Sequence, residues 1–179
     1  MQEIKWPMQA PGGAFLIGIG CGIVVGAGAV AITGALPSFL PPMVAGALAG
    51  AVFLISARIW GAARLGRPSR SQRLAMLIAV ALEFAAFWGL AASGWFNVWD
   101  SRTVMSVALG VVAAHFLLMR LSHGPWMLWL GVFTLVWIAF AELLGLPLAV
   151  LILGDGLLKA GVGAAMAKPM FVGATAAEA

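Results

Sequence analysis

The sequence has very few charged residues. Only 9% of its 179 residues are Asp, Glu, Lys or Arg, whereas 63% are hydrophobic. A soluble globular domain carries about 25% charged residues, which it needs to cover its surface. The shortage of charge therefore excludes a soluble domain, a disordered chain and a nucleic-acid-binding protein. Cysteine is equally scarce, and the single Cys21 excludes an intramolecular disulfide framework.

Long apolar runs make up most of the chain, and they predict an all-α, polytopic membrane protein. A helix needs about 20 apolar residues to cross the hydrocarbon core of a bilayer. The runs place six transmembrane helices at about 14–34, 42–62, 74–93, 103–121, 126–146 and 147–167. We expect residues 1–168 to form a single six-helix transmembrane domain, and residues 169–179 to form a C-terminal cytoplasmic tail.

The basic residues predict the orientation of these helices. Cytoplasmic loops of membrane proteins are enriched in lysine and arginine. With a cytoplasmic N-terminus, the outer side of the membrane receives Arg102, and the inner side receives Lys5, Arg58, Arg64, Arg67, Arg70, Arg73, Arg120 and Lys168. We therefore expect a multi-pass protein of the inner (plasma) membrane with both termini in the cytoplasm.

Two parts of the sequence resemble each other. Residues 57–61 (ARIWG) align with residues 141–145 (AELLG), and residues 74–78 (LAMLI) align with residues 148–152 (LAVLI). A three-span unit that occurs twice must insert in opposite orientations, as in many transporters and channels. The similarity raises the hypothesis of a 3+3 inverted repeat, and the alternative is a shared bias toward Leu, Ala and Gly.

The first predicted span carries Gly18, Gly22 and Gly26 at four-residue spacing. Small residues on one face let helix backbones approach closely in a membrane. The stripe has two interpretations. It is either a contact surface for a second copy or another membrane protein, or part of the packing within the chain, and we favour the packing.

Five ionisable residues within the apolar runs are the candidate functional residues. A charge near the bilayer centre costs at least about 2.5–3.5 kcal/mol, so such residues face the protein interior and commonly have a function. They are Glu83 in the third span, His115 in the fourth, Glu142 near the end of the fifth, and Asp155 and Lys159 in the sixth. We expect Glu83 and Asp155 to line a transport path, with Lys159 as the countercharge.

Structural roles are the alternative for several of these residues. Asp155 and Lys159 are one helical turn apart, so they can form an internal ion pair. His115 can be a packing residue, and His123 and Arg120 are expected to reach the inner headgroups. Glu83 has no local partner, and a carboxyl that exchanges a proton at membrane depth suits a proton-coupled carrier.

Metal-dependent and nucleophilic chemistry have little support in the sequence. One cysteine and two histidines form no close set of ligands, and no nucleophile stands beside a base. We therefore predict no metal, no cofactor and no catalytic residues. An enzyme is the less favoured class.

One stretch of the chain resembles a known family. Through Trp137, Glu142, Leu146-Pro147 and Asp155, residues 126–165 resemble the last two spans of acid-gated urea and amide channels, which are also six-span proteins. Those channels keep both termini outside, whereas the arginines here predict the opposite orientation, so we attribute the likeness to composition. In size and topology the chain also resembles the substrate-binding membrane components of vitamin importers, without a vitamin-specific motif.

These observations favour a membrane transporter or channel for a small solute or ion, coupled to protons through buried carboxylates. The first alternative is a non-catalytic membrane subunit or the substrate-binding component of a larger complex. The second is an intramembrane lipid-modifying enzyme. The expected partners are the lipid bilayer and the solute, with a second copy or a membrane-protein partner at the glycine-rich first helix, and no nucleic acid.

Overall fold

The chain is all-helical throughout the part that the structure describes. The structure, a computed structural model, describes the backbone of residues 6–65 and 67–175. Its elements are α1 (Gln9–Thr33), the 3₁₀ turn η1 (Leu36–Phe39), α2 (Leu40–Leu65), α3 (Arg70–Ala92), α4 (Trp95–Val98), α5 (Ser101–His123), α6 (Pro125–Leu143) and α7 (Leu148–Thr175). Within the described residues, six helices are long and apolar enough to span a membrane.

Each predicted span falls on one of these six helices, but several ends differ. Helix α1 begins at Gln9, ahead of the predicted start near residue 14, and the short helix α4 between the third and fourth spans was not predicted. Helix α7 continues to Thr175, so most of the predicted tail is helical. Residues 176–179 of that tail lie outside the described residues, as do Lys5 and the side chains of Arg58 and Arg64.

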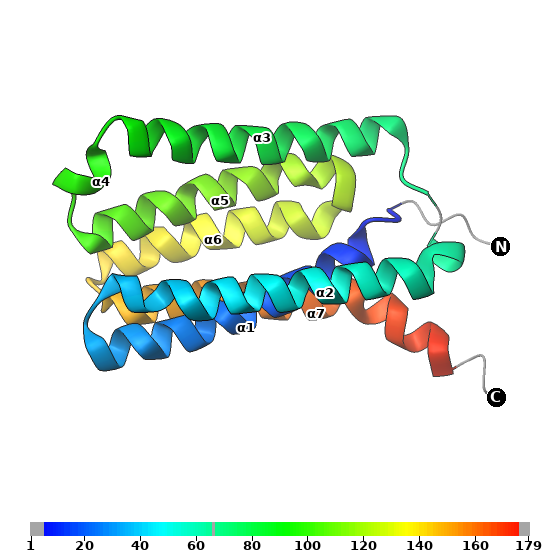
Figure 1. Cartoon of the computed structure of the whole chain (residues 1–179), viewed down its shortest axis with the longest axis horizontal. Coiled ribbons are helices and arrows are strands. Elements are labelled where there is room, and N and C mark those ends of the chain that lie inside the picture. The colour runs from blue at the N-terminus through cyan, green and yellow to red at the C-terminus, as the bar shows by residue number, and fades with distance from the viewer. Residues whose placement is uncertain (1–5, 66, 176–179) are drawn as a thin grey trace.

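The six long helices form two groups (Figure 1). Helix α1 packs against α2 and α7, and helix α5 packs against α3 and α6. Contacts of α6 with α7 and of α1 with α5 join the groups. Successive long helices run in opposite directions, so the start of α1 and the end of α7 lie at one end of the bundle, beside the loop between α2 and α3.

Glycines allow the helices of the first group to approach closely. Gly18 and Gly22 of α1 lie against Gly46 of α2, and a Cβ atom on Gly46 would stand 2.6 Å from the carbonyl oxygen of Gly18. On another face of α1, a Cβ atom on Gly13 would stand equally close to the carbonyl oxygen of Gly163 in α7. These glycines are therefore buried in packing within the chain.

This packing leads to a stability prediction for α1. In a Gly22→Ala variant the new Cβ would stand 2.5 Å from the carbonyl oxygen of Pro42 and 2.7 Å from the Cα of Gly46, so two backbones must separate. Overpacking of this kind costs about 1–3 kcal/mol. Gly28→Ala is the matched control, because a Cβ there has nothing within 4 Å and alanine favours the helix. Thermal unfolding in detergent should show a lower midpoint for Gly22→Ala only; equal midpoints would contradict the packing.

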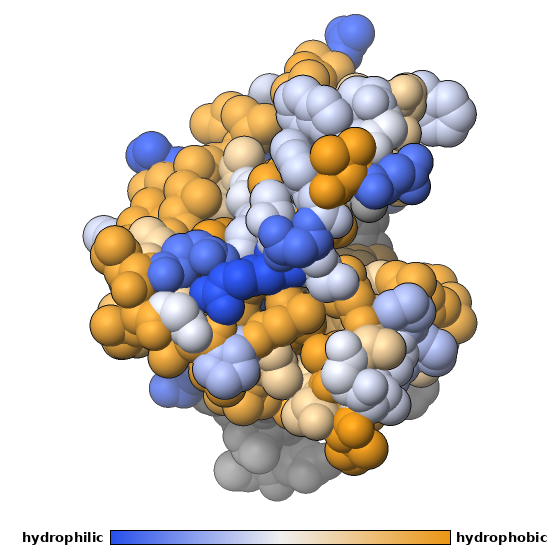
Figure 2. Space-filling view, turned by 90° about the vertical axis from the view of Figure 1, so that its left-hand side faces the viewer, coloured by the Kyte–Doolittle hydropathy of each residue, from blue (hydrophilic) through white to orange (hydrophobic). Residues whose placement is uncertain are grey.

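The outside of the bundle is largely apolar. Figure 2 views the end that carries the α1–α2, α3–α5 and α6–α7 connections; polar residues gather near the middle of this end, and apolar residues surround them. Many large apolar side chains are more than half exposed, among them Val25, Ile32, Leu48, Phe84, Trp88, Leu121 and Val136. Soluble monomers rarely expose an apolar surface this extensive.

Short capping interactions fix the ends of two helices. Ser69 and Gln72 form a capping box at the start of α3. At the start of α5, the Asp100 carboxylate accepts hydrogen bonds from the backbone N–H groups of Arg102 and Thr103 and from the Thr103 hydroxyl. The bonds from Thr103 and Arg102 lower the pKa of Asp100 below its ordinary value, as expected for a carboxylate at a helix N-terminus.

Candidate functional site

A cavity of about 860 Å³ lies between the two groups of helices. Its wall is formed by residues of α1, η1, α2, α3, α5 and α7, with Met127 from α6 and Trp99 from the connection between α4 and α5. Aromatic and methionine side chains make up much of this wall, namely Phe15, Phe39, Phe87, Trp99, Phe116, Met43, Met76, Met105, Met119 and Met127. The space is large enough for a small organic molecule, and its wall is predominantly apolar.

Four of the five candidate residues from the sequence line this cavity. They are Glu83 from α3, His115 from α5, and Asp155 and Lys159 from α7. We call these four residues the buried charge cluster. Because they come from three helices in different parts of the chain, only the tertiary fold brings them together.

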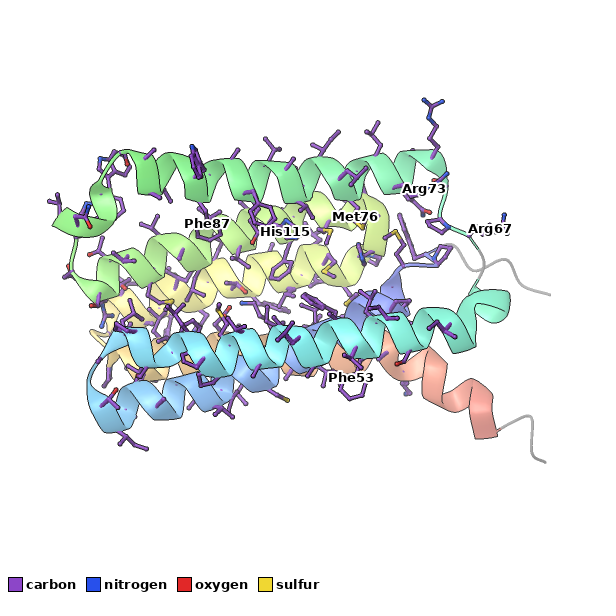
Figure 3. All side chains as sticks on the ribbon, viewed as in Figure 1. Phe53, Arg67, Arg73, Met76, Phe87 and His115 are labelled. Atoms are coloured by element: carbon purple, nitrogen blue, oxygen red, sulfur yellow. The ribbon has the colours of Figure 1, made fainter. Side chains whose placement is uncertain are left out.

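Glu83 and His115 form the first half of the buried charge cluster. The Oε2 atom of Glu83 lies 3.1 Å from Nδ1 of His115, and the two side chains are 23% and 8% exposed. Figure 3 shows His115 between α5 and α3, on the side of α3 that also carries Phe87 and Met76. At this distance a proton on the imidazole converts the contact into a charge-assisted pair.

Asp155 and Lys159 form the second half. They make an ion pair one turn apart on α7, and their side chains are 0% and 2% exposed. The Lys159 ammonium also lies 5.6 Å from the ring centroid of Phe116, within the range of a cation–π interaction. The Oδ2 atom of Asp155 is buried and has no hydrogen-bond partner within the described residues.

The two halves of the cluster share one electrostatic environment. The Lys159 ammonium acts on the Glu83 carboxylate, and so does the His115 imidazole when it carries a proton. Interactions between charges are stronger in a poorly polarisable interior than in water. A change of charge on His115 or Lys159 is therefore felt by Glu83.

Glu142, the fifth candidate, lies apart from the cavity. It is at the end of α6, where its carboxylate accepts a hydrogen bond of 2.9 Å from Nε of Arg102 and one of 2.6 Å from the Ser106 hydroxyl. Arg102 also donates to the carbonyl oxygens of Ala141 and Leu146. The guanidinium thus joins the start of α5 to the end of α6. Glu142 takes part in this contact, and its side chain is 41% exposed.

His123 differs from its predicted position at the inner headgroups. Its side chain is only 5% exposed, it lines the cavity, and its Nδ1 lies 2.8 Å from the Ser122 hydroxyl. The ring lies directly against Gly12 of α1, where a Cβ atom would collide with it. The prediction was wrong because the burial of His123 depends on a gap that a distant glycine leaves, which the sequence around His123 does not show.

The described residues contain no group of three or more His, Cys, Asp and Glu side chains placed to hold a metal ion. The buried charge cluster itself mixes two carboxylates with an ammonium and an imidazole. Side chains of these types can exchange protons and can bind a charged or hydrogen-bonding group.

Fold and site together define a protein whose described part is all-helical, with six helices suited to crossing a membrane and a cavity lined by the buried charge cluster. The chain belongs to a family of unknown function (DUF6609), whose model matches residues 1–171. No curated protein and no solved structure matches the chain.

Proposed function

We propose that the chain is an integral protein of the inner (plasma) membrane, with six spans and both termini in the cytoplasm. The apolar outer surface supports insertion into lipid. Arg67 and Arg73 lie at the end of the bundle where α1 starts and α7 ends (Figure 3), whereas Arg102 lies in the first turn of α5 at the opposite end. This distribution fits the enrichment of basic residues on the cytoplasmic side.

The packing order supports an inverted repeat of α1–α2–α3 and α5–α6–α7. In each half the first helix packs against the second, and it also packs against the third helix of the other half, as the contacts α1–α7 and α5–α3 show. One contact departs from this symmetry, because α6 packs against α7 while α2 and α3 lack a comparable contact among the described residues. Residues of α2 and α3 instead contribute to the wall of the cavity.

The function that this geometry supports best is transport of a small solute through the cavity, coupled to protons. The observation that carries the proposal is the cavity itself, which joins the buried charge cluster to a wall contributed by both halves. Transporters built from inverted repeats bind their substrates near the middle of the membrane, where the repeats meet. Ionisable residues at such a depth commonly mark substrate paths and proton relays.

The size and lining of the cavity favour a carrier over the alternative functions. A subunit that only holds other proteins together does not need an internal space of this size, and an ion channel needs a polar path, whereas most of this wall is apolar. A lipid-modifying enzyme needs a nucleophile that faces the substrate beside a base. The Ser122 hydroxyl contacts the His123 ring, but Ser122 is not among the described residues of the cavity wall. A carrier for a partly apolar solute accounts for both the wall and the charges.

Reconstitution tests the proposed function. The purified protein is incorporated into vesicles that contain a pH-sensitive dye, and these are challenged with three panels of small solutes: organic amines, monocarboxylates and neutral polar compounds. We expect one panel to move protons across the membrane in vesicles with the protein and not in protein-free vesicles. If no panel produces a protein-dependent change, proton-coupled transport of such solutes is contradicted.

A further inference from the structure

We infer that the cavity binds a lipophilic organic cation, such as a bulky amine or phosphonium ion, in exchange for a proton at the buried charge cluster. This inference deepens the proposed function and rests on it for its transport role, but the binding step can be tested separately. The charges, the hydrogen-bonding atoms and the wall each contribute to it.

The charges that face the cavity leave an excess negative charge. The ionisable groups in its wall are Glu83 on α3, His115 and His123 on α5, and Asp155 and Lys159 on α7. The wall residues contributed by α1, η1, α2 and α6 are uncharged. With both histidines neutral, the two carboxylates and the one ammonium give the cluster an excess of one negative charge. A proton on the Glu83–His115 pair brings this net charge to zero.

An excess charge in a buried cluster is unfavourable, because little solvent compensates it. A proton at the Glu83–His115 pair removes the excess, and so does a bound organic cation beside Glu83. When both are present, the cluster carries an excess positive charge, which is again unfavourable. The two species should therefore exclude each other, and cation binding should release about one proton.

The free hydrogen-bonding atoms also favour a cation over an anion. Asp155 offers the unpaired acceptor Oδ2, and Glu83 contributes a second carboxylate. The Lys159 side chain is already paired with Asp155 and lies over the ring of Phe116. An anionic group would have to compete with Asp155 for that ammonium, whereas a cation meets the unpaired Oδ2 of Asp155.

The wall fits an organic cation rather than a metal ion. Aromatic faces attract cations through the ring quadrupole, and flexible methionine side chains adapt to irregular apolar ligands. Phe87, Trp99 and Met76 lie in the same wall as Glu83. The volume of about 860 Å³ is within the range of small-molecule sites and far exceeds the space that a bare ion requires.

A matched pair of probe ions tests the inference. Tetraphenylphosphonium and tetraphenylborate have nearly the same size and shape but opposite charge. Their binding to the purified protein is measured by calorimetry in detergent at pH 6 and pH 8, with protein-free micelles subtracted. We expect the phosphonium ion to bind more tightly at pH 8, by up to about tenfold per pH unit for one exchanged proton, and to release about one proton per ion bound. The borate ion should show neither effect.

A conservative variant locates the exchange site. Glu83→Gln should weaken phosphonium binding and remove its pH dependence, whereas Glu142→Gln, which lies outside the cavity wall, should retain both. Equal binding of the two probe ions, or phosphonium binding without proton release in the unmodified protein, would overturn the inference even if the variant failed to fold.

The outcomes separate this inference from the proposed function. Phosphonium binding with proton release, in a protein that moves no panel solute in vesicles, would support the cation site and contradict transport. Protein-dependent transport of a solute panel, together with equal binding of the two probe ions, would support the carrier and overturn the cation site.

Discussion

An Asp155→Leu variant is expected to lose about 3–5 kcal/mol of its free energy of unfolding, because removing one partner of a buried ion pair leaves an uncompensated charge. The side chain of Lys159 is only 2% exposed and is paired with Asp155. In the variant its ammonium would lose this counterion, and the ring of Phe116 alone cannot replace a carboxylate. Unfolding by heat or denaturant in detergent micelles measures the loss.

The double variant Asp155→Leu/Lys159→Met provides the control for this effect. Replacing a buried pair with apolar residues of similar volume is often neutral or stabilising, so the second substitution should recover most of the lost stability. Glu142→Leu removes a carboxylate from a more exposed pair, and we expect it to cost at most about 1 kcal/mol. A single variant as stable as the unmodified protein would show that Lys159 does not depend on Asp155.

A Glu83→Gln variant is expected to reduce proton-coupled flux in vesicles to the protein-free background. Glutamine keeps the size and shape of the side chain but cannot exchange a proton at this position. It also removes the carboxylate that lies 3.1 Å from His115 and that gives the cluster its excess negative charge. The same dye-loaded vesicles used for the solute panels measure the flux.

Two comparisons make the Glu83 result specific. Glu142→Gln changes the same residue type outside the cavity wall, and its flux should stay within about twofold of the unmodified protein. Thermal unfolding of Glu83→Gln shows whether the fold is retained, which we expect because the Glu83 side chain is 23% exposed and the substitution preserves its volume. Flux of a folded Glu83→Gln variant at the unmodified level would exclude Glu83 from the mechanism.

The long helices could be predicted because their length is set by the thickness of a bilayer and their composition by its apolar interior. Their ends were less predictable. Helix α1 extends back to Gln9 and α7 forward to Thr175, and hydropathy does not mark where a helix continues beyond the apolar run. The short helix α4 depends on local turn geometry, including Gly94 at a φ of 73°, rather than on a hydrophobic pattern.

The candidate site could be predicted in part. Charges are costly in an apolar run, so Glu83 and Asp155 could be found without the structure, and helical spacing alone suggested the contact between Asp155 and Lys159. The contact of Glu83 with His115 joins α3 to α5, and no local sequence pattern encodes it. Their role in transport remains a proposal.

For Glu142, the sequence did not indicate the contacts that the structure shows. Its position near the end of an apolar run made it a candidate for the transport path, but its partners Arg102 and Ser106 lie about 40 residues earlier in the chain. Only the packing of α5 against α6 reveals that this carboxylate takes part in a contact between helix ends.

The most direct test of the central claim measures whether water and solutes reach the buried charge cluster through the cavity. A single cysteine is placed in a Cys21→Ser background, either at Val80, which lines the cavity one turn before Glu83, or at Leu77, which is 60% exposed on the outside of α3. Each variant is embedded in a bilayer and treated with a charged thiol reagent, which reacts with the thiolate and therefore requires water at the site. We expect the cysteine at Val80 to react at least about tenfold faster than the one at Leu77, and to be protected by tetraphenylphosphonium. Equally slow reaction at both positions would contradict a cavity through which solutes reach these charges.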